Sequence, residues 1–169
     1  MEEDKDKLQE NLKRINETGG AAGLKVNIQK VMTMVFGQEN ITEELMIGST
    51  RIENVTEFVY LGSLLTWDND CSEEIKRRLA RATGVMARFK TVWNSMHIST
   101  QTKLSIVRTC VICVLLYACE TWTLRKRDID SLMTFQMKCY RRILRMHWQQ
   151  KLTNSVIRQR LDINKMWCK

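Results

Sequence analysis

The chain has 169 residues and no proline, 44% of its residues are hydrophobic, and its formal net charge is +8. This length suits one domain or two small ones, and the apolar content is enough for a core, which excludes a disordered tail. The lack of proline favours long helices over a sandwich or a barrel.

The chain shows no signal for secretion or for membrane insertion. Residues 2–17 are charged throughout, unlike a signal peptide. The most apolar stretch, 109–119, is about half of the roughly 20 residues that a spanning helix needs. We therefore expect an intracellular protein, in the nucleus or the cytoplasm, that is not secreted and does not bind a membrane.

The net charge divides unequally along the sequence. Residues 1–71 hold 7 Lys and Arg against 13 Asp and Glu, a net charge of −6. Residues 72–169 hold 20 against 6, a net charge of +14. A domain with this much positive charge usually faces a polyanion, and nucleic acid is the first candidate.

The acidic half predicts one helix followed by a small antiparallel sheet. Apolar residues in 4–17 are spaced as in an amphipathic helix, which we expect to end at Gly19 and Gly20. Residues 23–36 fit two short strands or one bent strand, and three more extended segments follow, at 45–47, 51–55 and 57–61. Gly48 and Ser49 predict a hairpin turn. We assign 1–66 to this part and 67–71 to a connecting loop.

The connecting loop contains two alternate carboxylates, Asp68 and Asp70. Such a pair could share a cation, but a solvated turn is the more common use of this pattern. We favour the solvated turn.

The basic half, 72–169, predicts a helical bundle. Ser72, followed by Glu73 and Glu74, is a good helix start, with the hydroxyl as the N-cap. Apolar residues then recur at helical spacing as far as Met96. On the polar side, Arg77, Arg81 and Arg88 fall in line with Gly84 between them. They are either a guanidinium stripe for a phosphate backbone or an ordinary solvated face, and we weigh the two equally.

Three more helices complete the predicted bundle. Ser99 begins a buried helix over 100–121, and Thr153 caps a short helix that ends at Leu161. Between them lies a helix over 128–147. Its apolar side comprises Ile129, Leu132, Met133, Gln136, Tyr140, Ile143 and Leu144. Its basic side comprises Lys138, Arg141, Arg142 and Arg145.

The six cysteines lie at positions 71, 110, 113, 119, 139 and 168. Most fall within helical pattern, which suits buried, reduced thiols in an intracellular protein. Cys110 and Cys113 have the spacing of half a zinc site, but no second pair and no histidine stands at a useful distance. We predict no metal site and no cofactor for this chain.

The order of six motifs resembles the reverse transcriptases of non-LTR retrotransposons, closest to the endonuclease-reverse transcriptase proteins of RTE-like elements. The resemblance covers roughly residues 5–158. The motifs are GLKVNIQK (23–30), FVYLGS (58–63), EIKRRLARA (74–82), TKLSIVRT (102–109), LLYACETWTL (115–124) and YRRILRMHW (140–148).

The resemblance implies a role for each part. Residues 1–66 would be the end of the polymerase palm, and 72–169 the thumb that holds the template-primer duplex. Lys30 would lie near the phosphates of the incoming nucleotide. The family usually follows this lysine with Thr-Lys, whereas this chain has Val31 and Met32. Phe58, Tyr60, Leu61 and Gly62 match the hairpin that grips the primer.

The chemistry of that family depends on carboxylates that hold two Mg²⁺ ions. The resemblance places them on an earlier strand and on a hairpin upstream of residue 1, so Mg²⁺ is implied only for an intact polymerase. We therefore expect a truncated fragment of an RNA-directed DNA polymerase that does not polymerise by itself. Two alternatives stay open: a non-enzymatic basic module that binds nucleic acid, and a remnant that associates with itself or with a polymerase through its exposed sheet.

Overall fold

The computed structural model describes residues 5–37, 44–146, 150 and 152–163. The chain divides into two compact units, Met1–Asp70 and Cys71–Lys169, and the division falls within the 67–71 segment. The described residues are mainly helical, with a few short strands, which confirms the expected α+β class dominated by helix. Within these ranges, no helix has the length and apolar character required to cross a membrane.

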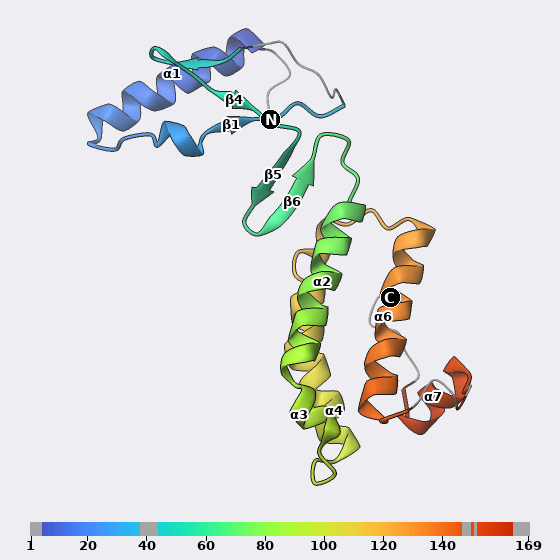
Figure 1. Ribbon diagram of the computed structural model, residues 1–169. Helices are drawn as coiled ribbons and strands as arrows, with labels where there is room; N and C mark the ends of the chain where they lie inside the picture. Colours follow the sequence, from blue (N-terminus) through green and yellow to red (C-terminus); the bar gives the residue numbers. More distant parts are fainter. Residues whose placement is uncertain (1–4, 38–43, 147–149, 151, 164–169) are drawn as a thin grey trace. The chain divides into compact units, whose positions relative to one another are not determined.

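The N-terminal unit begins with helix α1, Lys5–Ala21 (Figure 1). The expected end at Gly19 and Gly20 is wrong, because the helix runs through both glycines. The helix ends at Ala21, and Gly23 follows with a φ of 77°, the left-handed conformation that glycine adopts without steric cost. The Leu24 N–H donates to the Gly19 carbonyl at 2.8 Å, and the Gly23 N–H donates to the Gly20 carbonyl at 3.0 Å. These two bonds form the Schellman motif that commonly closes a helix.

Helix α1 covers a small apolar cluster. Leu45, Ile47 and Ile52 are buried, and Leu8 and Leu12 of α1 pack against them. The Gln9 side chain fixes the register of this contact, because its amide donates to the Met46 carbonyl at 2.7 Å and accepts the Met46 N–H at 2.9 Å. Gln9 thereby pairs with the backbone N–H and C=O of Met46, as a neighbouring strand would.

The short strands form three two-stranded ladders instead of one antiparallel sheet. Two of the ladders are antiparallel, but β1 (Met32–Thr33) pairs with β4 (Glu53–Asn54) in parallel, which corrects the predicted antiparallel sheet. Residues 24–30 are not a strand either. They lead into a 3₁₀ turn, η1, at Ile28–Lys30, where the Lys30 N–H bonds back to the Asn27 carbonyl at 2.9 Å.

Both predicted hairpins are present. Strands β2 (Met46–Ile47) and β3 (Thr50–Arg51) flank Gly48 and Ser49, and Gly48 has a φ of 61°. Strands β5 (Glu57–Tyr60) and β6 (Ser63–Thr66) pair over four residues each. Their turn places Leu61 and Gly62 at positive φ, 47° and 83°. Positive φ at both central residues is the hairpin geometry that suits twisted strands.

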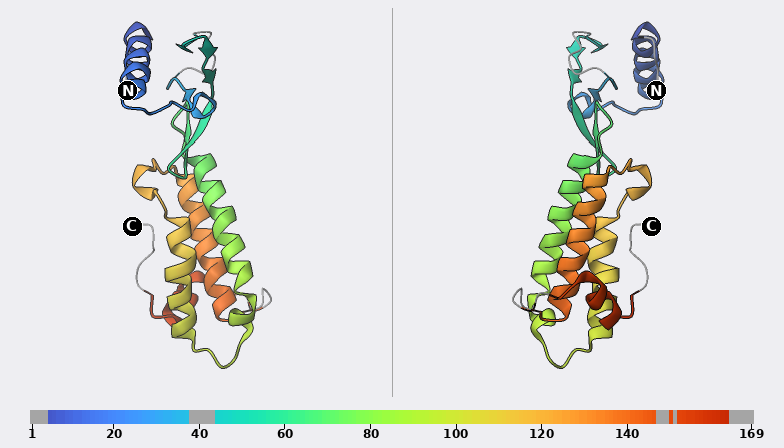
Figure 2. Two further views of the ribbon diagram at one scale, coloured as in Figure 1. Left: turned by 90° about the vertical axis from the view of Figure 1, so that its left-hand side faces the viewer. Right: turned by 90° about the vertical axis from the view of Figure 1, so that its right-hand side faces the viewer.

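The C-terminal unit is a bundle of three main helices with shorter ones at its ends (Figures 1 and 2). The chain runs along α2, returns along α4 and its continuation, and runs along α6 in the same direction as α2. The elements are α2 (Ser72–Arg88), α3 (Lys90–Asn94), α4 (Thr100–Ile106), the π-helix η2 (Val107–Ile112), α5 (Cys113–Leu115), η3 (Cys119–Thr121), α6 (Lys126–Ile143) and α7 (Asn154–Arg160).

The core of this unit lies between the three main helices. It includes residues from all of them, among them Ile75 of α2, Val111 of η2 and Tyr140 of α6, all at most 1% exposed. Ile157 of α7 is also fully buried. The apolar side predicted for α6 is buried or half-buried throughout, and Phe135, Met137 and Cys139 are buried as well. Helix α6 is therefore enclosed on more of its surface than its periodicity indicated.

The predicted helices differ from the observed ones at their ends. Helix α2 ends at Arg88, and Met96 lies beyond α3 with 83% of its surface exposed. The helix expected to reach Thr121 stops near Leu115, and Ala118 follows at a φ of 60°. Helix α6 ends at Ile143; the predicted extension to His147 and the Trp148 of the last motif lie outside the described residues.

Two of the three predicted N-caps do not form. Ser99 does cap α4, because its hydroxyl accepts the Thr102 N–H at 3.1 Å. Thr153 stands at the N-cap position of α7, but its hydroxyl faces that of Ser155 at 2.9 Å. Ser72 is already the first residue of α2 and Cys71 holds the N-cap position, with no side-chain cap bond, so the Ser72 hydroxyl is not the N-cap.

The Ser72 hydroxyl instead joins the starts of α2 and α6. It donates to the Asp128 carboxylate at 3.2 Å and accepts from the Arg127 guanidinium at 2.8 Å. The same carboxylate accepts the Arg125 N–H at 3.2 Å, which satisfies one of the free donors at the start of α6. The buried Asp128 carboxylate thus accepts a backbone N–H at the start of α6 and also links α6 to Ser72 of α2.

A buried ion pair lies one turn further along α2. Glu74 and Arg78 stand four residues apart, their side chains are 2% and 5% exposed, and the Arg78 Nε donates to the Glu74 carboxylate. The Arg78 guanidinium also lies over the Tyr117 ring, 4.6 Å from its centre, which adds a cation–π contact. These two charged side chains occupy the face of α2 that periodicity assigns to apolar residues.

We expect Arg78→Ala to destabilise the helical unit by about 3 kcal/mol, because it leaves the buried Glu74 carboxylate without its main partner. Lys76→Ala, which breaks the exposed Lys76–Glu73 pair on the same helix, should cost less than about 0.5 kcal/mol. Urea unfolding followed by circular dichroism measures both. The double variant Glu74→Leu/Arg78→Met should recover most of the loss; equal costs for the two single variants would contradict this account.

Candidate nucleic-acid interface

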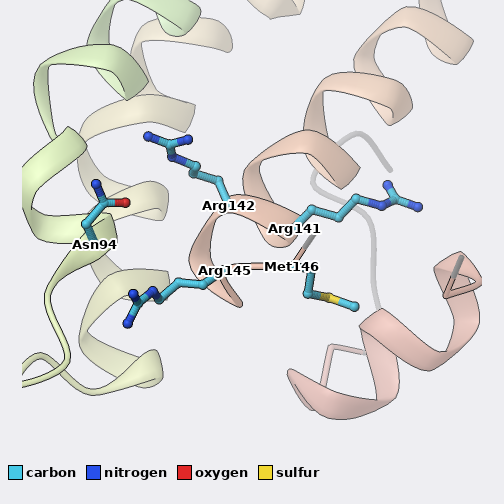
Figure 3. A pocket seen from close by; sticks show the side chains of 5 residues that line it. All are labelled: Asn94, Arg141, Arg142, Arg145 and Met146. Atoms are coloured by element: carbon cyan, nitrogen blue, oxygen red, sulfur yellow. The ribbon is translucent and has the colours of Figure 1, made fainter. Parts of the chain in front are cut away.

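A basic pocket lies at the end of the bundle where α3 and α6 finish. It has a volume of about 650 Å³ and is lined by Asn94, Arg141, Arg142, Arg145 and Met146 (Figure 3). The pocket is an open hollow on the surface of the unit, and its lining is more polar than apolar. Among the described residues, the lining includes three arginines and no acidic residue.

Asn94 is the last residue of α3, which is held by a fully buried tryptophan. The Trp93 indole N–H donates to the Met86 carbonyl in α2 at 2.7 Å, and the ring packs against Phe89 with their centres 5.8 Å apart. In a continuous helix these seven residues would span about 10 Å, beyond the reach of an indole. The break after Arg88 therefore brings Trp93 back onto α2, and Asn94 with it.

A buried lysine fixes the end of α3. Lys103 of α4 is 4% exposed, and its ammonium donates to the carbonyls of Trp93 and Ser95 at 3.1 and 2.6 Å. These carbonyls flank Asn94 on both sides, at a helix end where backbone acceptors lack partners and a positive charge is favourable. The pocket's Asn94 is thus held from α2 and from α4.

The end of α6 supplies the arginines. Helix α6 closes with a Schellman motif, because the Met146 N–H donates to the Arg141 carbonyl at 3.0 Å and the Arg145 N–H to the Arg142 carbonyl at 3.2 Å. Arg145 takes the left-handed position of that motif, with a φ of 54°. Glycine is the usual residue there, and a larger side chain costs on the order of 1 kcal/mol.

The side chains of the three arginines extend in two different directions. Arg142 and Arg145 extend to the side of the pocket where Asn94 lies, whereas Arg141 extends toward α7 (Figure 3). The Arg141 guanidinium donates to the Asn154 side-chain oxygen at 2.8 Å and so ties the start of α7 to the end of α6. Within the described part of the chain, the ion pairs do not involve these three arginines.

The basic stripe expected on α2 is only partly preserved. Arg77 is half-buried, and its guanidinium lies 3.4 Å from the buried Glu74 carboxylate. Arg81 and Arg88 are exposed, and Arg88 lies in the last turn of α2, at the same end of the bundle as the pocket. Nothing lies within 4 Å of a Cβ added at Gly84, so its surface is open. Lys138 of α6 is exposed as well.

The other predicted site residues belong to the N-terminal unit. Lys30 is exposed at the end of η1. On the β5–β6 hairpin, Phe58 is half-buried, while Tyr60 and Leu61 are 58% and 75% exposed beside Gly62 at the turn. Exposed apolar side chains at a hairpin turn suit contact with another molecule, and both the primer-grip role and self-association stay predictions.

The Asp68–Asp70 segment has the geometry of a closed turn. The Asp68 carboxylate accepts the Asp70 N–H at 3.0 Å, and this bond lowers the pKa of Asp68. The described ranges contain no group of three or more His, Cys, Asp and Glu residues that could hold a metal ion. Within these ranges, the residues do not fit the carboxylate site that two Mg²⁺ ions would need.

The cysteines are free thiols in different surroundings. Of the five in the described ranges, Cys139 is buried, Cys71, Cys110 and Cys119 are half-buried, and Cys113 is exposed. The expectation of buried thiols is thus confirmed for Cys139 and wrong for the exposed Cys113, while the other three are only partly buried. Cys168 lies outside the described residues.

Sequence reasoning found the arginines of the pocket but missed the residues that position them. Lys103, Asn94 and Asn154 are isolated polar residues with no spacing that marks them. Lys103 falls within the TKLSIVRT motif, which was the one available signal.

Comparison with known proteins adds no relative: no protein-family model matches the chain, and neither the curated proteins nor the solved structures gave a significant match.

We expect Lys103→Met to lower the free energy of unfolding by about 1–2 kcal/mol, because two carbonyls at the end of α3 lose their donor. Lys90→Met, on the exposed side of α3, is the matched control and should be nearly neutral. Urea titration measures both. A Lys103→Met protein as stable as the unsubstituted chain would mean that burial of the ammonium offsets its hydrogen bonds.

We expect a maleimide reagent to label Cys113 in the folded protein and to leave Cys139 unlabelled until urea is added. Burial raises the pKa of Cys139 to about 12, so almost none of it is thiolate at neutral pH. Mass spectrometry of digested samples locates the label. Labelling of Cys139 at the rate of Cys113 would contradict the packing of α6.

Proposed function

We propose that the helical unit binds the phosphate backbone of a nucleic-acid duplex, as the thumb-like part of a non-LTR reverse transcriptase. The observation that carries this proposal is the pocket at the end of α6, where the lining residues that the structure describes include three arginines and no acidic residue. Guanidinium groups bind phosphate oxygens in pairs of hydrogen bonds, which makes arginine the preferred partner of a phosphate backbone.

The distribution of charge supports the same proposal. The unit carries a net charge of +14 over residues 72–169, from 20 basic and 6 acidic residues. Two of the acidic side chains, Glu74 and Asp128, are buried and used in internal contacts. Two basic side chains, Arg78 and Lys103, are buried as well, so burial leaves the net charge of the unit unchanged. A surface of this charge attracts polyanions over a distance set by salt.

The resemblance to reverse transcriptases supplies the choice of a duplex. The six motifs fall in the order found in that family, and the motifs of the helical unit lie where the family has its thumb. The proposal assigns binding to this unit and no chemistry. The alternative is a basic module that binds nucleic acid of any form. Such a module would bind single strands as tightly as duplexes, whereas a thumb-like unit would prefer the duplex.

We expect the chain to bind a short RNA–DNA duplex with an affinity that falls steeply with salt. If about four to six phosphates are contacted, the plot of log K against log salt concentration should have a slope of roughly −4 to −5. Fluorescence anisotropy at several salt concentrations measures it. Absence of binding at low salt, or affinity that does not change with salt, would contradict the proposal.

Substitutions within the unit test where the duplex binds. Arg142→Gln and Arg88→Gln should each weaken binding to all sequences alike and reduce the slope by about 1. Arg14→Gln, which removes an exposed arginine of α1 in the other unit, is the matched control and should change neither quantity. Arg77→Glu is unsuitable as a test, because it would place a second carboxylate beside the buried Glu74.

A further inference from the structure

The end of α6 places an arginine where local stability favours glycine. Arg145 adopts a φ of 54° at the left-handed position of the Schellman motif. Asp162 takes the same position at the end of α7, with a φ of 51° and the Ile163 N–H bonded to the Arg158 carbonyl at 3.0 Å. Unusual backbone conformations of this kind cluster at functional sites, where the surroundings maintain them.

The left-handed turn also sets the direction of the Arg145 side chain. Arg142 stands three residues earlier, in the last turns of α6, and both side chains extend to the side of the pocket where Asn94 lies (Figure 3). The amide of Asn94 offers N–H donors from α3, an element held in place by Lys103 and Trp93. Donors from two separately fixed elements thus line one pocket.

We propose that Arg142, Arg145 and Asn94 form a seat for a single phosphate group, and that Arg145 occupies the left-handed position because this conformation directs its guanidinium into the seat. The choice of phosphate rests on the proposed function. A phosphate presents several acceptor oxygens, which two guanidinium groups and an amide can bind together. The group could belong to the backbone of a strand or to its 5′ end, and the chemistry of recognition is the same.

Two glycine substitutions distinguish the effect of the backbone conformation on stability from the effect of the Arg145 side chain on binding. Arg145→Gly relieves the left-handed conformation and removes the guanidinium, whereas Asp162→Gly relieves the same conformation and leaves the seat intact. Thermal unfolding in about 1 M NaCl, which screens the charge at the helix ends, should show both variants melting about 2–4 °C higher than the unsubstituted protein. An Arg145→Gly protein that melts lower would overturn the account of the turn.

Binding is measured on the same variants with a blunt RNA–DNA duplex, with and without 5′-phosphates. We expect Arg145→Gly to lose about five-fold or more in affinity for at least one of the two duplexes and Asp162→Gly to lose none. Loss only with the 5′-phosphorylated duplex assigns the seat to strand ends; equal loss with both assigns it to the backbone. Unchanged affinity of Arg145→Gly for both duplexes overturns the inference and leaves the proposed function standing.

Inorganic phosphate provides a second measurement. At matched ionic strength, phosphate should displace the duplex from the unsubstituted protein more effectively than chloride, and this difference should disappear in Arg145→Gly. A difference that persists in Arg145→Gly would place the phosphate elsewhere and overturn the inference. If the unsubstituted protein binds no duplex at low salt, the proposed function is wrong, and the proposed phosphate seat is wrong as well.

Discussion

The basic end of the bundle depends on how Lys103 and Trp93 hold α3. The indole of Trp93 joins α3 to the last turns of α2, and the Lys103 ammonium holds the two carbonyls that flank Asn94. Both side chains are almost completely buried, so this arrangement belongs to the core and not to the surface. Without these contacts nothing would hold α3 to α2 and α4, and Asn94 would not be fixed in the lining of the pocket.

Buried carboxylates lie at one end of the bundle, and the arginines of the pocket lie at the other. Helices α2 and α6 run in the same direction, so their starts lie at one end and their finishes at the other (Figure 1). The buried carboxylates Glu74 and Asp128 lie near the starts, where helix dipoles favour negative charge. The arginines of the pocket lie at the finish of α6, where the dipole favours positive charge. The same arrangement that stabilises the helices places an arginine cluster at the end of α6.

Much of the fold follows from local sequence, but its ends and long-range contacts do not. Periodicity locates the three main helices, and Gly48 and Gly62 mark both hairpin turns. Periodicity could not show that Glu74 and Arg78 occupy the inner face of α2, because their mutual pairing makes burial possible. It also placed the end of α1 at the wrong glycines, since glycine can continue a helix and only Gly23 has the left-handed conformation that ends one.

The candidate site, too, could be predicted from the sequence only in part. The sequence indicates that Arg141, Arg142 and Arg145 share the basic side of one helix, and the structure adds that Arg141 is directed to α7 while the other two extend toward Asn94. This division depends on where α6 ends and on the conformation of Arg145. No residue pattern encodes either, because arginine is not the residue that a left-handed helix end favours.

The central claim is that the guanidinium groups at the end of α6 contact phosphate. Its most direct measurement is NMR of the arginine Nε–H groups during titration with a short RNA–DNA duplex. The account predicts that the signals of Arg142 and Arg145 shift first and furthest, while that of the buried Arg78 stays in place because its Nε–H is bonded to Glu74. Shifts confined to arginines outside the pocket, with Arg142 and Arg145 unchanged, would contradict it.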